Sequence, residues 1–450
     1  MAKLPTLTPT RVFEPLGDQL SNAQQIVVGF SGGLDSSVLL HSLSQKVEAH
    51  RIMAIHINHG LSENADHWQA HAEDFCQSLG VKFLSETVKL VGDGGGLEDA
   101  GRLARYEVFE RCLDEDGILL LGHHQDDQVE TLLYRLMRGT GPRGLAGIPK
   151  TRSVGKGVLH RPLLNWPKSS LLDYARENNI QWIEDESNES NDFDRNYLRN
   201  KLIPLIADRW PDYRHRLEGV ANISRNSDLL SHSIAIEDMR GLKIRTERGG
   251  WSLSLRPFGL LPSLRQANVL RYWAECYGLS APGLKIINEI GSSVIGARVD
   301  ASPKVVCQDV EYHRYSDRLY LLESARVLND FEETSSKVLW DLNAKSKLEA
   351  PMMLAATTVI GEGIRTPKDG CLKVSFRQGG ERCRPSGRAH STSLKKCLQE
   401  FGLEPWWRDQ VPLIFIDEEL VAVADLWVCE GWEPSVQEKG IKIHWQDNSL

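Results

Sequence analysis

The sequence predicts an α/β protein with an N-terminal doubly wound parallel sheet, a mostly helical middle domain and a small α/β C-terminal domain. Three observations support this class. Apolar runs rich in β-branched residues alternate with helical patterns near the N-terminus, long helical patterns follow, and strand and helix patterns return near the C-terminus. The predicted domains span residues 1–214, 215–330 and 351–450.

Length and composition are those of an ordinary globular protein. The 450 residues are 41% hydrophobic and 25% charged, which excludes disordered and fibrous classes. A net charge of −8 indicates that any polyanion site is a local patch. No run of about 18 uncharged apolar residues occurs, so we expect a cytoplasmic protein with no membrane partner. The eight cysteines form no Cys-x-x-Cys pair, which argues against zinc, an iron–sulfur cluster and thiol exchange.

Four strands are predicted in the first domain, at Ile26–Phe30, Ile52–Ile57, Val81–Leu84 and Ile118–Leu121. Helical patterns connect them, and right-handed crossovers then give the parallel sheet of a Rossmann-like domain. Ligands bind such sheets at the carboxyl ends of the strands. We therefore expect three polar clusters to converge on one rim: Ser31–Asp35, His56–His59 and His123–Asp127.

The segment Ser31–Ser36 reads SGGLDS and joins the first strand to a helix. Its glycines let backbone N–H groups approach an anion, its hydroxyls add donors, and the helix N-terminus adds partial positive charge. A Walker motif would end in Gly-Lys-[Ser/Thr], whereas Asp35 stands here and would hold a metal ion or orient the loop. The spelling SGGxDS resembles the PP-loop of the N-type ATP pyrophosphatases. The alternative is a plain Gly-Ser turn between strand and helix.

A histidine and carboxylate cluster begins where the fourth strand ends and continues as a helix. Asp127 and Glu130 are spaced i,i+3, so they share one helical face. Carboxylates near a helix N-terminus, with His123 just before them, can bind Mg²⁺ or the ammonium group of an amine substrate. Helix capping explains the acidic residues equally well.

Two arginine pairs lie on predicted helices. Arg102 and Arg105 can stabilise the negative charge that develops when ATP is opened, or can simply cover a surface helix. Arg195 and Arg199 are one turn apart. They can bind RNA phosphates, or pair with the acidic run 184–186.

Two segments carry excess positive charge. Residues 371–410 hold eight basic and four acidic residues, a net +4, and the Gly- and Pro-rich segment 138–168 holds seven basic residues and no acid, a net +7. A flexible basic loop beside a nucleotide pocket suits binding of a phosphate backbone. A solvated loop that merely happens to be basic is the alternative. The seven basic residues are Arg138, Arg143, Lys150, Arg152, Lys156, Arg161 and Lys168.

The chain resembles the tRNA(Ile)-lysidine synthetase family in six ordered segments: SGGLDS at 31–36, HINHGLS at 56–62, EDAGRLARY at 98–106, LGHHQDDQVETLLYRLMRGTGPRGLAG at 121–147, RPLL at 161–164 and WIEDESNESNDFDRNYLRN at 182–200. The match covers about the first 215 residues closely. Two later segments resemble the C-terminal domains of the family: RQGGERCRPSGR at 377–388 and LKKCLQEFGLEPWWRDQVPL at 394–413.

The resemblance implies an enzyme that modifies the cytidine at the first anticodon position of a minor tRNA(Ile) with anticodon CAU. ATP adenylates the oxygen on carbon 2 of the base, and the ε-amine of lysine then displaces AMP. The product, lysidine, changes the tRNA identity from methionine to isoleucine. The implied cofactors are ATP and Mg²⁺, and the implied partners are this tRNA and L-lysine. A homodimer is the oligomeric state that we consider for the protein.

The resemblance also assigns residues. The ATP loop comprises Ser31, Gly32, Gly33, Leu34, Asp35 and Ser36, with Asp35 also organising the metal ion. The lysine-binding constellation comprises His123, Asp127 and Glu130. Arg105, and less closely Arg102, matches an arginine near the phosphates, so that the catalytic set is Asp35, Arg105, His123, Asp127 and Glu130. The basic segments would bind the tRNA through Arg138, Arg143, Arg195, Arg199, Arg382 and Arg384.

Two points stay open at the sequence level. The lysine amine must lose a proton before it attacks, and spacing does not decide whether His123 or Glu130 accepts that proton. The segment 161–168 reads RPLLNWPK, where the family pattern has an arginine soon after the leucines. This departure leaves open the contacts that Asn165 and Lys168 make.

Three rival functions fit the sequence less well. A tRNA thiolase that carries sulfur on a cluster or persulfide generally needs paired cysteines. An NAD or GMP synthetase does not need the basic segments, and its motif after LGHH differs. A non-enzymatic RNA-binding module would not need ATP-binding and cation-binding clusters at successive strand ends.

Overall fold

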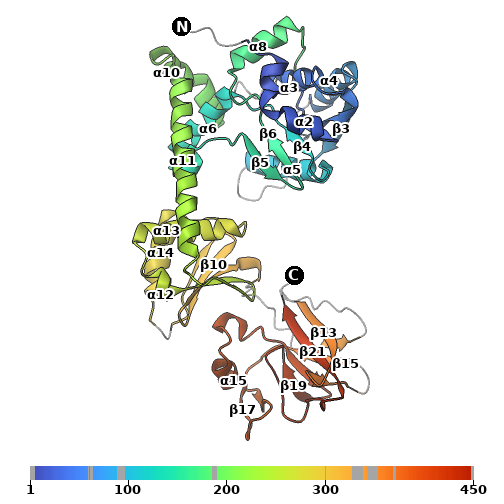
Figure 1. Ribbon diagram of the computed structural model, residues 1–450, viewed down its shortest axis with the longest axis vertical. Helices are drawn as coiled ribbons and strands as arrows, with labels where there is room; N and C mark the ends of the chain where they lie inside the picture. The colour runs from blue at the N-terminus through green and yellow to red at the C-terminus, as the bar shows by residue number, and fades with distance from the viewer. Residues whose placement is uncertain are drawn as a thin grey trace. The chain divides into compact units, whose positions relative to one another are not determined.

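A computed structural model describes residues 6–58, 60, 64–88, 97–184, 190–298, 301–326, 338–342, 353–367 and 371–446. The chain forms two compact units, Met1–Leu229 and Leu230–Leu450, which we describe in turn. The boundary between them falls inside one long helix, α11 (Tyr213–Met239), which is easily followed in Figure 1. The expected division into three domains stays a prediction.

The first unit contains a six-stranded sheet in the order β3-β2-β1-β4-β6-β5. All neighbours are parallel except β5 and β6, and Ile26 pairs with both Ile52 and Ile118. The four predicted strands and the parallel sheet are confirmed. The strands are β1 (Ile26–Gly29), β2 (Ile52–Asn58), β3 (Lys82–Thr87), β4 (Ile118–Leu120), β5 (Thr151–Val154) and β6 (Gly157–His160).

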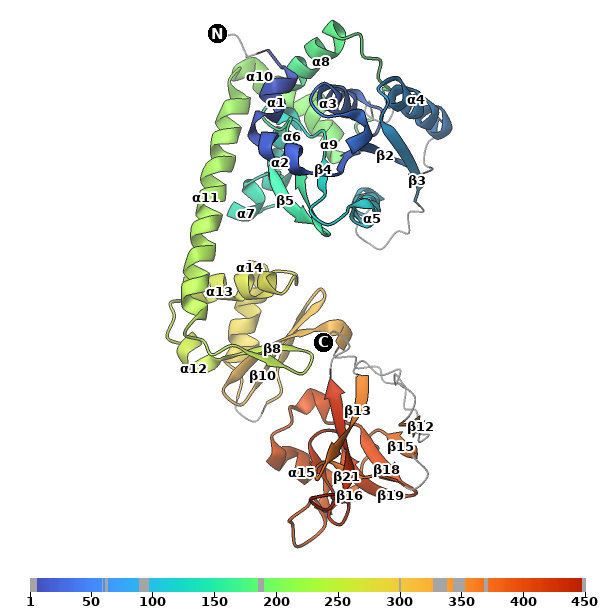
Figure 2. The same ribbon diagram turned by 45° about the vertical axis from the view of Figure 1, so that its right-hand side comes forward.

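Helices cover both faces of this sheet, as Figure 2 shows for α3 and α5. Alternate side chains of β1 point to opposite faces: Ile26 and Val28 pack with Leu39 of α3, and Val27 packs with Phe109 of α5. The doubly wound arrangement is therefore confirmed. The helices are α1 (Pro9–Phe13), α2 (Gly17–Asn22), α3 (Leu34–Ser44), α4 (Ala65–Ser78), α5 (Leu97–Cys112), α6 (Gln125–Met137), α7 (Pro142–Leu145), α8 (Lys168–Glu177), α9 (Asp194–Tyr197), the π-helical turn η4 (Leu198–Leu202) and α10 (Ile203–Arg209).

The strand order reverses between β1 and β4, which is where ligands bind in sheets of this kind. Gly122, just after β4, lies directly against the start of α3. A Cβ atom on Gly122 would lie 3.0 Å from the carbonyl carbon of Asp35 and 3.1 Å from the backbone nitrogen of Ser36. A larger residue here would push the PP-loop backbone away by a few tenths of an ångström, so glycine keeps the start of α3 close to the end of β4.

The basic segment 138–168 is not one continuous loop, because short regular elements interrupt it. It contains α7, the β5–β6 hairpin and the start of α8. Two side chains of α6 hold it: Arg135 Nη1 donates to the carbonyls of Gly144 (3.0 Å) and Gly147 (2.9 Å), and Gln128 Nε2 donates to the carbonyl of Ile148 (3.2 Å). Tertiary hydrogen bonds, which a Gly- and Pro-rich composition conceals, order this segment.

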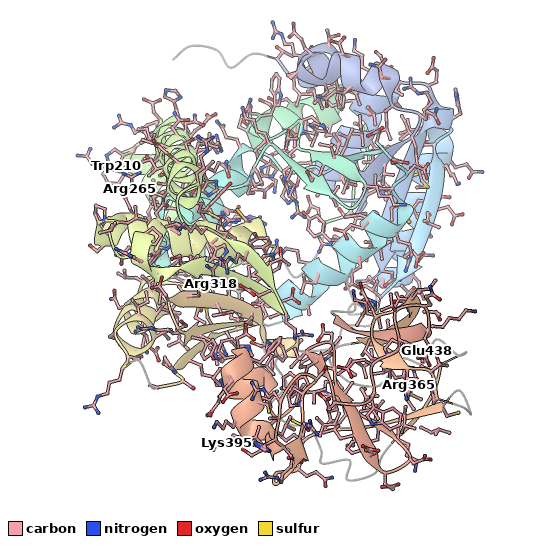
Figure 3. The ribbon with its side chains drawn as sticks, turned by 60° about the horizontal axis from the view of Figure 1, so that its bottom comes forward. Trp210, Arg265, Arg318, Arg365, Lys395 and Glu438 are labelled. Carbon is pink, nitrogen blue, oxygen red and sulfur yellow. The ribbon has the colours of Figure 1, made fainter. Side chains whose placement is uncertain are left out.

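The second unit begins with the end of α11 and a five-stranded antiparallel sheet in the order β7-β8-β11-β10-β9. Trp273 of α13 and Tyr312 of β10 are fully buried in its core. Arg265 of α13, labelled in Figure 3, pairs with Asp238 of α11 at 2.6 Å. The elements are β7 (Arg245–Glu247), β8 (Gly250–Ser254), α12 (Leu255–Phe258), α13 (Ser263–Cys276), α14 (Leu284–Glu289), η5 (Ile290–Ile295), β9 (Lys304–Cys307), β10 (Val310–Tyr315) and β11 (Arg318–Glu323).

The predicted helices and the predicted strand 318–323 of this middle region are confirmed as α11, α13 and β11. The four other strands were not predicted. They are short, and most lie next to tight turns with positive φ, such as those at Lys243, Gln308 and Ser316. Short strands of this kind give little periodicity for a sequence pattern to reveal.

The C-terminal region packs a five-stranded antiparallel sheet (β12-β15-β18-β19-β20), a three-stranded sheet (β13-β21-β14) and one helix around a shared core. The predicted strand 372–376, helix 393–401 and strand 413–416 are confirmed, and the predicted linker 329–337 lies outside the described residues. The elements are β12 (Val338–Asp341), β13 (Met353–Ile360), β14 (Ile364–Arg365), β15 (Cys371–Ser375), β16 (Arg382–Cys383), β17 (Thr392–Ser393), α15 (Leu394–Phe401), β18 (Leu413–Ile416), β19 (Glu419–Val423), β20 (Trp427–Val428) and β21 (Lys439–Gln446).

All eight cysteines are free thiols. Within the described part of the chain, none of the helices combines the length and the apolar character that a membrane crossing requires.

We expect Gly122→Ala to displace the Ser31–Ser36 loop, because the added Cβ meets backbone atoms that cannot rotate away. The free energy of unfolding should fall by about 1–3 kcal/mol, and ATP affinity should fall with it. Chemical denaturation and an ATP titration measure the two quantities. Gly141→Ala is the matched control, because a Cβ there meets nothing within 4 Å. Native ATP affinity in Gly122→Ala would contradict the role given to this close approach.

Candidate active site

The Ser31–Ser36 loop is held by hydrogen bonds of its own. Ser36 Oγ donates to the carbonyl of Gly33 (3.1 Å) and accepts from the backbone N–H of Ser31 (3.2 Å), while Ser31 Oγ accepts from the N–H of Gly33 (3.3 Å). Gly32 has φ +81°, a left-handed conformation that glycine adopts without strain, and its carbonyl accepts from the N–H of Ile183 at 2.9 Å. In this structure the two serine hydroxyls therefore shape the loop.

Asp35 carries a buried oxygen with no hydrogen-bond partner. This oxygen, Oδ1, lies 3.5 Å from Nε2 of His124, too far for a well-formed hydrogen bond. A buried acceptor left in this way costs free energy, which a cation would recover. Among the described residues, no group of three or more histidine, cysteine or acidic side chains is placed to hold a metal. Mg²⁺ commonly takes one or two carboxylates plus phosphate oxygens, so Asp35 fits a magnesium ion that arrives with a nucleotide.

His124 caps α6. Its Nδ1 accepts from the backbone N–H groups of Asp126 (3.2 Å) and Asp127 (3.3 Å), and Asp127 Oδ2 accepts from the N–H of His124 (2.8 Å). This reciprocal pair is a capping box in which histidine takes the place of serine or threonine. The capping role of Asp127, one of the two alternatives from the sequence, is thus present in the structure.

The pKa values at this helix start are shifted. Burial raises the pKa of Asp127, the charges of Asp35 and Glu130 raise it further, and His124 opposes them. Burial alone would lower the pKa of His124, but its contacts with Asp35 and Asp127 outweigh burial and raise it. Proton transfer at Asp127 is therefore brought closer to neutral pH.

Glu130 is buried and held by Arg199. Arg199 Nε donates to Glu130 Oε1 (2.6 Å) and Nη2 donates to Oε2 (2.8 Å), and Nη2 also lies 3.9 Å from Asp127 Oδ1. Arg199 comes from the π-helical turn η4, a conformation common at functional sites. The structure therefore joins Asp127 and Glu130 through an arginine that the sequence had assigned to RNA. Residues 185–186, two of its alternative partners, lie outside the described residues.

His123 faces arginines. Its Nδ1 accepts from Nε of the buried Arg161 at 3.2 Å. Burial, with the charges of Arg161, Arg105, His124 and Arg195, lowers the pKa of His123 to about 3. The imidazole is therefore neutral at physiological pH. Arg105 is exposed on α5 yet close enough to act on His123, as expected for a residue near the site.

Two of the predicted RNA-binding arginines flank one tyrosine of α6. The guanidinium groups of Arg138 and Arg195 lie 5.3 Å and 5.7 Å from the centre of the Tyr134 ring. Arg143 is exposed on the short helix α7. These residues belong to the first unit, as the PP-loop does.

The other two predicted arginines lie in the second unit, exposed at β16 and just after it. Arg382 Nη2 donates to the carbonyl of Ser391 (2.8 Å), and Arg384 Nε donates to the carbonyl of Arg388 (2.7 Å). The cluster expected at His56–His59 differs from the prediction. His56 lies inside β2, buried, with its Nδ1 3.1 Å from the carbonyl oxygen of Phe30, and residue 59 lies outside the described residues.

Sequence reasoning missed three residues of the site. Arg199 was assigned to RNA, Arg161 was only counted in a basic segment, and His124 was not assigned at all. The signal for His124 was its position directly before the first helical residue, where caps occur. Arg161 stands in the RPLL segment, but its contact with His123 depends on the pairing of β4 with β6. That pairing was not predicted.

Comparisons with known proteins agree with this geometry. A PP-loop domain matches residues 7–206, a TilS substrate binding domain matches 253–320, and a TilS substrate C-terminal domain matches 372–445. The tRNA(Ile)-lysidine synthase of Coxiella burnetii is 35% identical over 444 residues, 98% of this chain and 97% of the relative. The chain belongs to the tRNA(Ile)-lysidine synthase family.

Other members are similar over most of their length. The tRNA(Ile)-lysidine synthase of Legionella pneumophila strain Paris is 35% identical over 90% of this chain and 92% of its own. That of Serratia proteamaculans is 34% identical over 96% of this chain and 98% of its own. The resemblance found in the sequence is confirmed. The chain is a ligase of tRNA modification with an ATP-binding PP-loop, and the three rival functions fall away.

Removing Arg199 should leave the buried Glu130 carboxylate without its charge partner. We expect Arg199→Met to lower the free energy of unfolding by about 1.5–3 kcal/mol, the range for hydrogen bonds to charged groups. The double variant Glu130→Gln/Arg199→Met should regain much of this loss, because the buried Glu130 charge that Arg199 neutralises is then absent as well. Denaturant unfolding of the native protein, the two single variants and the double variant measures the coupling. Additive losses would show that the pair is not coupled.

Proposed function

We propose that the protein ligates L-lysine to carbon 2 of the cytidine at the first anticodon position of a minor tRNA(Ile) with anticodon CAU. The base oxygen on carbon 2 attacks the α-phosphorus of ATP, and diphosphate leaves. The ε-amine of lysine then attacks carbon 2, and AMP leaves with that oxygen. The lysidine formed changes codon and amino-acid specificity from methionine to isoleucine.

One observation carries this proposal: buried carboxylates and a group of arginines occupy one site, at the adjoining ends of β1 and β4. Asp35 and Asp127 suit a cationic amine, and His123 lies among arginines that suit phosphate oxygens. A reaction that brings the ammonium group of lysine to an adenylated base needs both. A site that bound only phosphates and one magnesium ion would use Asp35 but would not need Asp127 as a partner for an amine.

A magnesium ion would be held by Asp35, and when bound it would neutralise charge on the ATP phosphates. The PP-loop amides and the N-terminus of α3 would bind the same phosphates. Arg105 would stabilise the charge on the departing diphosphate.

In this proposal the proton acceptor for lysine is Asp127, rather than His123 or Glu130. Both oxygens of Glu130 are engaged by Arg199, and Nδ1 of His123 is engaged by Arg161. The pKa of Asp127 is raised above that of an ordinary carboxyl, and a group with such a pKa accepts a proton from an ammonium more readily. Asp127 would therefore bind the ε-ammonium and then take its proton.

The tRNA would contact both units. Arg138, Arg143 and Arg195 would bind phosphates of the anticodon arm, and Arg382 and Arg384 would bind the acceptor arm. Replacing one of these arginines should reduce the slope of log binding constant against log salt concentration. The reduction should be about 0.7–0.9 for each phosphate that the arginine neutralises. The homodimer and the cytoplasmic location stay predictions.

The first test is incorporation of labelled lysine into unmodified tRNA(Ile) with anticodon CAU, in the presence of ATP and Mg²⁺. Methionine tRNA is the control, because it shares the anticodon. Label in the isoleucine tRNA alone, with AMP released, is the expected result. AMP release without label in either tRNA would point to a nucleophile other than lysine.

Substitution of Asp127 should separate the two half-reactions. Asp127→Ala should slow lysine transfer more than adenylation, but it also removes the cap of α6. Asp127→Asn keeps an acceptor for the His124 N–H and removes only the charge, so it is the sharper variant. We expect a loss of about 10²-fold or more in lysine transfer and a small change in lysine-free diphosphate release. Equal losses in both steps would assign Asp127 to the metal or to the fold.

A further inference from the structure

We propose that Arg161 is a positioning residue that holds His123 as a neutral hydrogen-bond donor for an anionic oxygen of the substrates. The inference rests on the proposed function and concerns the same site. It gives a role to the RPLL segment, and it removes His123 from the candidates for the base.

The argument begins with the chemistry of the guanidinium group. Arginine has five N–H donors, no acceptor, and does not lose its proton in proteins. The nitrogen of His123 that faces Arg161 Nε at 3.2 Å must therefore be a bare acceptor. Because that nitrogen is Nδ1, the hydrogen of the neutral imidazole lies on Nε2. This assignment follows from the donor alone.

Arg161 is itself fixed. It is buried, and its Nη1 donates to the carbonyl of Pro149 (2.7 Å) while its Nη2 donates to the hydroxyl of Tyr106 (3.2 Å). Its backbone N–H donates to the carbonyl of Lys150 at 3.0 Å. Both ends of the fork are thus anchored, so the guanidinium cannot turn away from His123 without breaking these bonds. The orientation of the imidazole is therefore determined by β6 and its flanking turn.

The charges around His123 oppose a second proton. Arg161 and Arg105 act most strongly, and Arg195 adds to them from α9. All three are cations, and none is a carboxylate. A charged His123 would also place its Nδ1–H against the Arg161 donor, which is a repulsive contact.

A neutral Nε2–H can donate but cannot accept. His123 therefore cannot take the proton of the lysine amine through either nitrogen. Its chain neighbours Gly122 and His124 both contact Asp35, so the His123 backbone lies beside the PP-loop, and the residue is only partly buried. An anionic oxygen is the group that such a donor would stabilise. Two substrates bring one: the α-phosphate of ATP and the α-carboxylate of lysine.

The tautomer is tested by nitrogen-15 NMR of the full-length protein with labelled histidine. The His123 signals are identified by their loss in His123→Gln. We expect one neutral tautomer, with the hydrogen on Nε2, between about pH 5 and 8 in the absence of substrates. Arg161→Met should release the ring, giving mixed tautomers and a titration inside this range. Arg161→Lys should restore the fixed tautomer at least in part, because it keeps an N–H donor.

Arg152→Met is the matched control for the loss of positive charge. Arg152 lies over the ring of Tyr106, 4.2 Å from its centre, and beside Arg161, whereas the hydrogen bond to His123 comes from Arg161. This variant should keep the fixed tautomer. If Arg161→Met fails to fold, the native protein still shows which nitrogen of His123 carries the hydrogen. Arg161→Lys and Arg152→Met then show whether that tautomer depends on the donor at position 161.

Kinetics of His123→Ala then identify the oxygen. If diphosphate release without lysine slows by about 10²–10³-fold, the acceptor is the phosphate. If that step is unchanged and the KM for lysine rises, the acceptor is the lysine carboxylate. A hydrogen on Nδ1, a charged native imidazole near pH 7, or native kinetics in His123→Ala would each overturn the proposal. Lysine incorporation by the native enzyme tests the proposed function separately, so the two failures are distinguishable.

Discussion

The start of α6 is the constraint on which the site depends. The side chain of each of His124 and Asp127 accepts a hydrogen bond from the backbone N–H of the other. These bonds fix the first turn of α6, and the next turn carries Glu130. Because Gly122 lies against the backbone of Asp35, the helix also begins at a fixed distance from the PP-loop. The cap is present in the structure, and in the function that we propose the same side chains also take part in the chemistry.

Two consecutive residues lie in environments of opposite charge. His123 and His124 are neighbours, yet the pKa of the first is lowered by burial and arginines, and the pKa of the second is raised by carboxylates. A positively charged environment and a negatively charged environment thus meet between two consecutive residues. Such a division suits a reaction in which a cationic amine and a phosphate must meet at one carbon atom.

The sequence was sufficient where local patterns decide structure. Buried β-branched runs, the Gly-rich turn after β1 and the i,i+3 carboxylates predicted the sheet, the PP-loop and the acidic face of α6. It was insufficient where distant segments meet. The contact of Arg161 with His123 joins segments 38 residues apart, and the pairing of Arg199 with Glu130 joins segments 69 residues apart. Periodicity and spacing carry no record of such contacts.

The unsatisfied oxygen of Asp35 and the raised pKa of Asp127 have a consequence for evolution. A carboxyl whose pKa is raised by folding adds stability below its ordinary pKa, and the folded state loses that stability as the pH rises through the raised value. Near neutral pH the ionised form of Asp127 therefore lowers the stability of the fold, against the stabilisation that its cap of α6 provides. Selection for heat tolerance alone would favour a residue at this position that keeps the cap without a buried charge.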